Sequence, residues 1–253
     1  MIQYALKLPV LDSLLNIIFD MKIALLGYGR MGKEIEKIAL SRGHEIVIRK
    51  DVEDIIDITL ADVAIDFSVP NAAFNNITNC IENNVPVIAG TTGWLEKYEE
   101  VVAFCNQKNG AFLYASNFSV GVNIFFELNQ QLAKMMRTLQ DYEISMEEIH
   151  HTQKLDAPSG TAISLAEQIL TNLGRKNKWV NAASANSNEL VIQSERIDPA
   201  PGTHIVKYSS EVDDIEIIHT AHTRVGFASG AVLAAEFAFE KKGIFTMKDV
   251  LGL

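Results

Sequence analysis

The segment from Glu147 to Ala162, EEIHHTQKLDAPSGTA, carries the densest group of chemically capable side chains in the 253-residue chain. It begins at the end of an alternating apolar stretch, whose period of two would send His150 and His151 to opposite faces of a strand. Histidine is the side chain best suited to exchange a proton near neutral pH, and Lys154 follows His151 by three residues. We therefore expect proton-transfer chemistry here, with different roles for the two histidines.

The second half of this segment is typical of an anion-binding site. It leads into a predicted helix over 161–173 that Ser159 or Gly160 can cap. Amides of Gly160 and Thr161 at the helix N-terminus would bind a carboxylate, and Lys154 adds a positive charge. Together these features predict a site for an acidic substrate that needs protonation. The alternatives are a purely structural loop and metal binding by the histidine pair. No third metal ligand is evident, so we predict no metal.

The string GYGRMG is the second chemical signal, because it places GxGxxG between a predicted strand and a predicted helix. In a dinucleotide-binding loop the first glycine, here Gly27, makes the tight turn. The second, Gly29, leaves room for a pyrophosphate, and the third, Gly32, lets the helix pack closely. We predict dinucleotide binding, with a turn kept only for packing as the alternative.

The residues that discriminate between NADH and NADPH should lie at the end of the second strand, about 20 residues beyond the glycines. That strand ends in Arg49 and Lys50, with Asp51 directly after. A cation there favours a 2′-phosphate over a ribose 2′-hydroxyl, so NADPH should bind at least as well as NADH. The alternative is that one or both are ordinary solvated cations.

Two further loops follow the fourth and fifth predicted strands, where a doubly wound sheet binds its ligands. Their small and hydroxylated residues would allow close approach to a nicotinamide ribose and amide, although as isolated strings they would be only turns. The residues expected to contact the cofactor are Gly90, Thr91, Thr92, Ala115, Ser116, Asn117 and Phe118.

The elements that must position these residues divide the chain into two patterns. Strands and helices alternate up to residue 118, which predicts an α/β fold with a Rossmann-type, doubly wound parallel sheet. The later segments have few helices between strands, which predicts an inserted α+β domain with a mostly antiparallel or mixed sheet. The predicted strands are 22–26, 45–49, 63–67, 85–89, 111–115, 141–151, 189–197, 204–209 and 214–222, with helices at 31–39, 71–83, 94–105, 121–138 and 161–173.

The last predicted helix, residues 227–242, is strongly apolar and is expected to return to the first domain. We therefore expect a dinucleotide-binding domain of residues 21–118 completed by 227–253, and a substrate-binding domain of residues 119–226. Residues 1–20 are expected to be an N-terminal extension rather than a signal peptide, because polar residues interrupt their apolar positions and no small-residue cleavage site follows. A short docking helix is the alternative.

Composition excludes several classes of protein. The 22 Lys and Arg against 32 Asp and Glu give a net charge of -10, which argues against a nucleic-acid-coating protein. No apolar run approaches the roughly 20 residues that span a bilayer, so we expect no membrane partner. Cys80 and Cys105 have no neighbouring Cys or His at metal-ligand spacing, which favours neither disulfides nor zinc and fits a reducing cytoplasm.

The strings GYGRMG, GTTG, ASNFSVGVN, EEIHHTQKLDAPSGTA and HTAHTRVGFASGA follow one another in an order that resembles the dihydrodipicolinate reductases, the 4-hydroxy-tetrahydrodipicolinate reductases of bacterial lysine biosynthesis. The resemblance runs from Lys22 to the C-terminus. It implies a cytoplasmic enzyme, usually a homotetramer built through the substrate-domain sheet. It also implies reduction of a small cyclic dicarboxylate by NADPH or NADH, with loss of water, in diaminopimelate and lysine biosynthesis.

Carried over residue by residue, the resemblance makes His150 the general acid/base and Lys154 a second proton donor. It makes His151, Gly160 and Thr161 ligands of the substrate carboxylates. Interdomain hinges would lie at Phe118-Ser119 and near Arg224. We interpret His219 and His222, which match strand positions near the hinge, as structural or as supporting residues that do not touch the substrate. The implied contacts of the glycine loop with the cofactor are Gly27, Tyr28, Gly29, Arg30, Met31 and Gly32.

Two features depart from the family pattern. The glycine loop is one residue shorter than the common GxxGRMG form, and Arg49 replaces the acid often found at the end of the second strand. The rival enzyme is a reductase of the aspartate-semialdehyde type, which needs a nucleophilic cysteine in the second domain, whereas Cys80 and Cys105 both lie in the first. A non-catalytic NADP(H) sensor is the other rival, but it would have no use for His150 and Lys154 beside an anion-binding helix.

Overall fold

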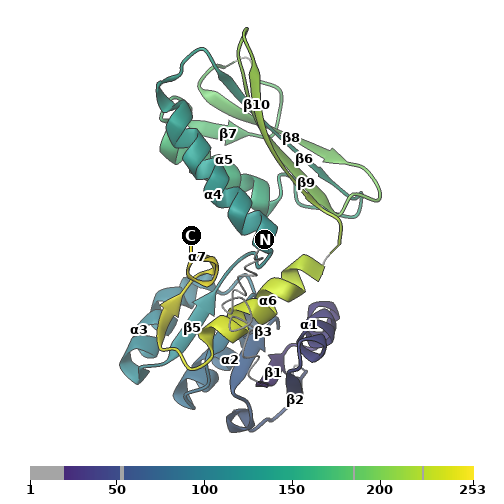
Figure 1. Ribbon diagram of the computed structural model, residues 1–253, viewed down its shortest axis with the longest axis vertical. Helices are drawn as coiled ribbons and strands as arrows, with labels where there is room; N and C mark the ends of the chain where they lie inside the picture. Colours follow the sequence, from purple (N-terminus) through teal and green to yellow (C-terminus); the bar gives the residue numbers. More distant parts are fainter. Residues whose placement is uncertain (1–19, 52–53, 185, 224) are drawn as a thin grey trace, which may run out of the picture.

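The computed structural model describes residues 20–253 except 52–53, 185 and 224, and it contains two separate sheets, each with its own helices (Figure 1). The expected extension, apart from Asp20, and the expected hinge residue Arg224 lie outside the described residues. None of the helices within the described part of the chain is long and apolar enough to cross a bilayer.

The first sheet has six parallel strands in the order β11-β5-β4-β3-β1-β2, which confirms the predicted doubly wound α/β class. Its strands are β1 (Lys22–Leu26), β2 (Glu45–Lys50), β3 (Val63–Asp66), β4 (Val87–Ala89), β5 (Ala111–Tyr114) and β11 (Gly243–Phe245), and its helices are α1 (Arg30–Ser41), α2 (Pro70–Glu82), α3 (Tyr98–Lys108), α6 (Val225–Ala238) and α7 (Met247–Leu251).

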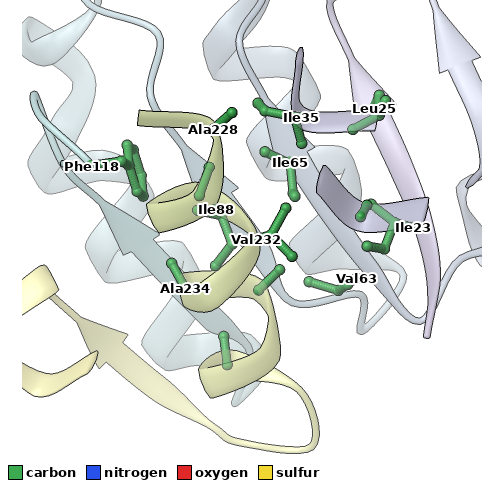
Figure 2. Close-up of a cluster of buried hydrophobic side chains, with 14 of the residues drawn as sticks. Ile23, Leu25, Ile35, Val63, Ile65, Ile88, Phe118, Ala228, Val232 and Ala234 are labelled. Carbon is green, nitrogen blue, oxygen red and sulfur yellow. The ribbon is translucent and has the colours of Figure 1, made fainter. Parts of the chain in front are cut away.

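Alternation along the central strands divides the buried side chains of this sheet between two cores. In β1, Ile23 and Leu25 point to a core shared with α1 and α6, whereas Ala24 and Leu26 point to a core shared with α2 and α3. Figure 2 shows Val232 of α6 in the core to which Ile23 and Leu25 point. Because both faces are covered, strands such as VAID of β3 are wholly buried.

Helix α6 carries out the predicted return to the first sheet, although it ends earlier than expected. Its buried face is made largely of alanines, which allow close approach to the sheet. The prediction of helix as far as 242 was wrong, because Glu240 adopts a positive φ of 60° and Gly243 then begins β11. Similarly β4 begins at Val87 rather than at 85, since Pro86 has no N–H to pair.

The second sheet is mixed, with strand order β10-β9-β6-β8-β7. The pairs β6·β9 and β9·β10 are antiparallel, whereas β6·β8 and β7·β8 are parallel. Helices α4 and α5 cover one face, and α5 is the crossover that the parallel pair β6·β8 requires. The elements are α4 (Val120–Met135), β6 (Glu143–His150), α5 (Gly160–Leu173), β7 (Lys178–Val180), β8 (Glu189–Arg196), β9 (Gly202–Ser209) and β10 (Asp214–Ala221).

Candidate active site

The loop after β5 meets the start of α5, which brings the two groups of predicted site residues together. The Asn117 side-chain amide donates a hydrogen bond to the Thr161 hydroxyl, with 3.4 Å between Nδ2 and Oγ1. Asn117 belongs to the predicted cofactor loop, and Thr161 to the predicted substrate site. A ligand bound to the first sheet could therefore face one held at the helix start.

The glycine loop between β1 and α1 has the geometry that dinucleotide binding requires. A Cβ at Gly27, which has φ of 98°, would lie 2.3 Å from the Phe67 carbonyl oxygen. A Cβ at Gly32 would lie 2.3 Å from the Gly27 carbonyl oxygen, whereas one at Gly29 would meet no atom within 4 Å. The fold itself thus requires the first and third glycines, and the second leaves open space where a pyrophosphate would approach. Arg30, the first residue of α1, is exposed beside this space, and Met31 is half-buried.

Lys50 and Arg49 at the end of β2 differ in their surroundings. Lys50 lines a cavity of about 180 Å³ beside the glycine loop, and its ammonium donates to the Asn76 side-chain oxygen over 2.7 Å. Arg49 instead binds the Glu36 carboxylate, with 2.9 Å between Nε and Oε1. Hydrogen bonds from Arg49 and Tyr28 lower the pKa of Glu36, so Arg49 already has an anionic partner. Lys50, whose partner is neutral, is the better candidate for a phosphate ligand.

A buried network around Asp66, at the end of β3, supports the GTTG loop and was not anticipated. The Thr91 hydroxyl and the Asn76 amide donate to the Asp66 carboxylate, while the Ser68 amide donates to the Thr91 hydroxyl over 2.8 Å. Burial raises the pKa of Asp66, and these hydrogen bonds oppose that effect. The hydroxyl of Thr91 is therefore engaged within the protein. The acid at a strand end was the signal that could have revealed this network.

The other predicted cofactor residues divide into exposed and buried positions. Thr92 and Ser116 are exposed, and Ala115 is half-buried. The side chain of Phe118 lies in the first core against Phe67, with ring centroids 5.5 Å apart. Only the backbone of Phe118 could meet a cofactor in this arrangement. A Cβ at Gly90 would lie 2.3 Å from the ring of Phe67, so packing alone requires glycine there.

His150 and Lys154 are four residues apart in the sequence and lie in different environments. His150 ends β6 and is buried on the face that the helices cover, whereas His151 follows the strand and is half-buried. The Lys154 ammonium is 2.8 Å from both oxygens of Asp156. This contact lowers the pKa of Asp156. An incoming carboxylate could replace Asp156 as the partner of Lys154.

The start of α5 has the predicted cap. The Ser159 hydroxyl accepts a hydrogen bond from the Ala162 amide over 3.2 Å. Gly160 is exposed, and a Cβ there would meet no atom within 4 Å. The side of the helix start at Gly160 is therefore open, as carboxylate binding requires.

Three side chains that the sequence did not single out surround His150. Glu148 of β6 and His204 of β9 contact the His150 ring, and Arg196 of β8 contacts Glu148. Atoms of Glu148, His150 and His204 that could bind a metal lie within 4.8 Å of one another. The expectation that no third metal ligand is present was therefore wrong for His150. The Glu148 carboxylate, however, already accepts hydrogen bonds from Ser159 and Arg196. A metal ion would have to bind beside the Arg196 cation. These residues therefore fit an ion pair between Glu148 and Arg196 better than they fit a metal site.

A glycine loop on a doubly wound parallel sheet, together with a second sheet whose α5 contacts the loop after β5, is typical of a nicotinamide-dependent oxidoreductase. Family models described as the N-terminus and the C-terminus of dihydrodipicolinate reductase match residues 38–118 and 121–251. The chain belongs to the dihydrodipicolinate reductase family, as the resemblance implied.

Individual relatives agree with this assignment. The chain is 55% identical over 235 residues to the 4-hydroxy-tetrahydrodipicolinate reductase of Christiangramia forsetii, covering 91% of this chain and 98% of that one. It is 36% identical over 233 residues to the enzyme of that name from Thermosipho africanus, again covering 91% and 98%. A dipicolinate-bound dihydrodipicolinate reductase from Paenisporosarcina sp. TG-14 shares the fold, with a TM-score of 0.76 at 22% identity, covering 91% of this chain and 99% of that one.

Proposed function

We propose that this chain reduces 4-hydroxy-tetrahydrodipicolinate to tetrahydrodipicolinate with NADPH or NADH, releasing water, in diaminopimelate and lysine biosynthesis. The observation that carries the proposal is the contact between Asn117 and Thr161, because it joins the predicted cofactor loop to the acid–base segment. The shared name of the relatives supports the choice of substrate.

In the proposed site, His150 and Lys154 are the catalytic residues, and His151, Gly160 and Thr161 bind the substrate carboxylates. When bound, a dihydronicotinamide would supply a hydride to the ring carbon that loses the hydroxyl. The hydroxyl would leave as water together with a proton from the adjacent ring carbon, and one proton from the protein would then replace the one lost there. Lys154 would exchange Asp156 for a substrate carboxylate, and either His150 or Lys154 would deliver the proton. The amides at the start of α5 would fix the dicarboxylate.

The proposed domains are residues 21–118 completed by 227–253, and residues 119–226. Closure of the two about Phe118-Ser119 would exclude water during hydride transfer. Although the chain carries a net charge of -10, Lys50 beside the glycine loop and Lys154 beside the helix start would make the site locally cationic.

We further propose a cytoplasmic homotetramer assembled through the second sheet. The face of this sheet opposite α4 and α5 carries Ile218, which is 56% exposed, opposite the half-buried Ile205. Packing against another copy would bury these side chains. Both cysteines are buried and free, as suits a reducing compartment.

The proposed activity is tested by following NADPH absorbance while the condensation product of aspartate semialdehyde and pyruvate is supplied. We expect absorbance to fall only when that product is present. Aspartate semialdehyde alone is the control, since NADPH consumed with it would show reduction of the aldehyde itself rather than of the condensation product. No loss of absorbance under either condition, with NADPH or NADH, would contradict the proposal.

The surroundings of β2 predict which cation sets cofactor preference. Replacing both Arg49 and Lys50 by alanine should raise the KM for NADPH relative to NADH by about 10- to 100-fold, since a lost charge-assisted hydrogen bond costs about 1.5–3 kcal/mol. Lys50→Ala alone should account for most of this change, because Glu36 already neutralises Arg49. An unchanged ratio of the two Michaelis constants in the double variant would show that neither cation reads the 2′-phosphate.

A further inference from the structure

We infer that Glu148 is a positioning residue for the acid–base pair: its buried carboxylate orients His150 and, through Arg196, holds the loop that carries Lys154. This inference rests on the proposed function. Glu148 lies two residues before His150 on β6, so both point to the face that α4 and α5 cover.

The Glu148 carboxylate is wholly buried, and its partners show that it remains ionised. The Ser159 amide donates to its two oxygens over 3.0 and 3.1 Å, and the Arg196 guanidinium donates over 3.1 Å. Burial by itself would raise the pKa of Glu148, but hydrogen bonds from His150, Ser159 and Arg196 outweigh it and hold the pKa well below its ordinary value. Glu148 therefore presents a fixed negative charge to its neighbours.

This charge lies next to one particular nitrogen of His150. The distance from His150 Nε2 to Glu148 Oε2 is 3.4 Å, which favours a proton on Nε2. The Nδ1 edge of the ring faces Gly202, where a Cβ would lie only 3.2 Å from Nδ1 and 2.8 Å from Cε1. Glu148 thus selects the tautomer in which Nδ1 is the atom left to exchange a proton.

The charges of the other groups around His150 show which anion its ring contacts. His204 of β9 lies with its Nε2 3.4 Å from His150 Nε2. Burial, followed by the neighbouring His150, lowers the pKa of His204 to about 4, so His204 is neutral at neutral pH. Among the residues that the structure describes, the other titratable groups near the cluster are Arg196 from β8, Lys154 and Asp156 from the loop after β6, and His219 from β10. Of the two anions, Asp156 is paired with Lys154, so Glu148 is the carboxylate that the His150 ring contacts.

Arg196 extends the influence of Glu148 to the loop of Lys154. It pairs with His150 in the parallel register of β6 and β8. Its Nε donates to the Lys154 carbonyl over 3.2 Å, and its Nη2 donates to the Asp156 carbonyl over 2.6 Å. One guanidinium thus joins the backbone on both sides of Leu155 to the Glu148 carboxylate. Loss of the Glu148 charge would leave this half-buried cation uncompensated and loosen the loop.

The test is Glu148→Gln, which keeps the size of the side chain and removes its charge. We expect kcat to fall by about 10- to 100-fold, less than for loss of a proton donor itself. The high-pH limb of kcat/KM should move to lower pH by about one unit or more, because an anion within about 4–6 Å favours the protonated form. The KM for NADPH should not change. Glu147→Gln is the matched control, since Glu147 directly precedes Glu148 and points to the opposite face of β6.

A second variant and a second measurement separate positioning from a structural role. Glu148→Asp keeps the charge with a shorter reach, so it should restore the position of the pH limb while remaining slower than wild type. If both variants lose thermal stability equally and neither moves the pH limb, Glu148 is only structural. A Glu148→Gln variant with wild-type kcat and pH profile would also overturn the inference.

Nitrogen-15 NMR of histidine-labelled protein provides a readout that does not need activity. In the wild type the neutral ring of His150 should carry its proton on Nε2, and Glu148→Gln should lose this preference. If the wild type does not consume NADPH but shows the Nε2 tautomer, the proposed function is wrong, but the contact between Glu148 and His150 is supported. A wild-type Nδ1 tautomer would refute the role of Glu148, whatever the enzyme does.

Discussion

Lys154→Ala should lower kcat by about 10²- to 10⁴-fold, the range expected for loss of a proton donor, and leave the KM for NADPH unchanged. His150→Ala should have a similar effect. His150 lies on β6 of the second sheet and Lys154 lies in the loop after β6, whereas the glycine loop lies on the first sheet. Steady-state kinetics with saturating NADPH, together with a direct NADPH titration, would measure the two effects separately.

The ion pair with Asp156 shows why Lys154 rather than any other lysine should have this effect. Its ammonium is held 2.8 Å from each Asp156 oxygen at the edge of the site. Lys207→Ala is the control, because Lys207 lies on the same sheet but pairs with Asp214 and Glu216 of β10. Near-normal turnover in both Lys154→Ala and His150→Ala would remove these residues from the catalytic assignment.

Gly29→Ala should weaken NADPH binding by at least about tenfold, a loss of about 1.4 kcal/mol, without destabilising the fold. A methyl group there meets no atom of the protein within 4 Å, so it would enter only the space left for the pyrophosphate. Gly32→Ala should instead destabilise the fold, since its Cβ would lie 2.3 Å from a backbone oxygen. Overpacking of this kind costs about 1–3 kcal/mol.

Thermal denaturation with and without NADPH distinguishes the two glycine variants. We expect Gly29→Ala to melt at the wild-type temperature but to gain less stability from NADPH. Gly32→Ala should melt lower even without cofactor, by about 2–4 °C for each kcal/mol lost. Equal NADPH affinity in Gly29→Ala and wild type would argue that the pyrophosphate does not approach this loop.

Most of the fold could be predicted because its longer elements have a clear period and clear ends. The strand, glycine turn and helix from Lys22 to Ser41 follow the predicted pattern closely. The missed elements β7, β11 and α7 span only three to five residues. Segments this short contain too few residues to show a period, and neighbouring strands decide whether they pair.

The candidate site could be predicted only where its residues are continuous in the sequence. His150, Lys154 and the start of α5 lie within one segment, so their types and spacing were informative. Arg196 and His204 reach Glu148 and His150 through strand register, with Arg196 opposite His150 and His204 opposite Glu148. Register depends on the whole sheet, and no local pattern at either residue indicates it.

The return of α6 and β11 has a consequence for synthesis of the chain. One of the two cores of the first sheet includes Ala228, Val232 and Ala235, and β11 pairs with β5 at the sheet edge. A ribosome produces all five strands of the second sheet before these residues emerge. We therefore expect the second sheet to fold first during translation. One face of the first sheet stays uncovered until α6 and β11 have been synthesised.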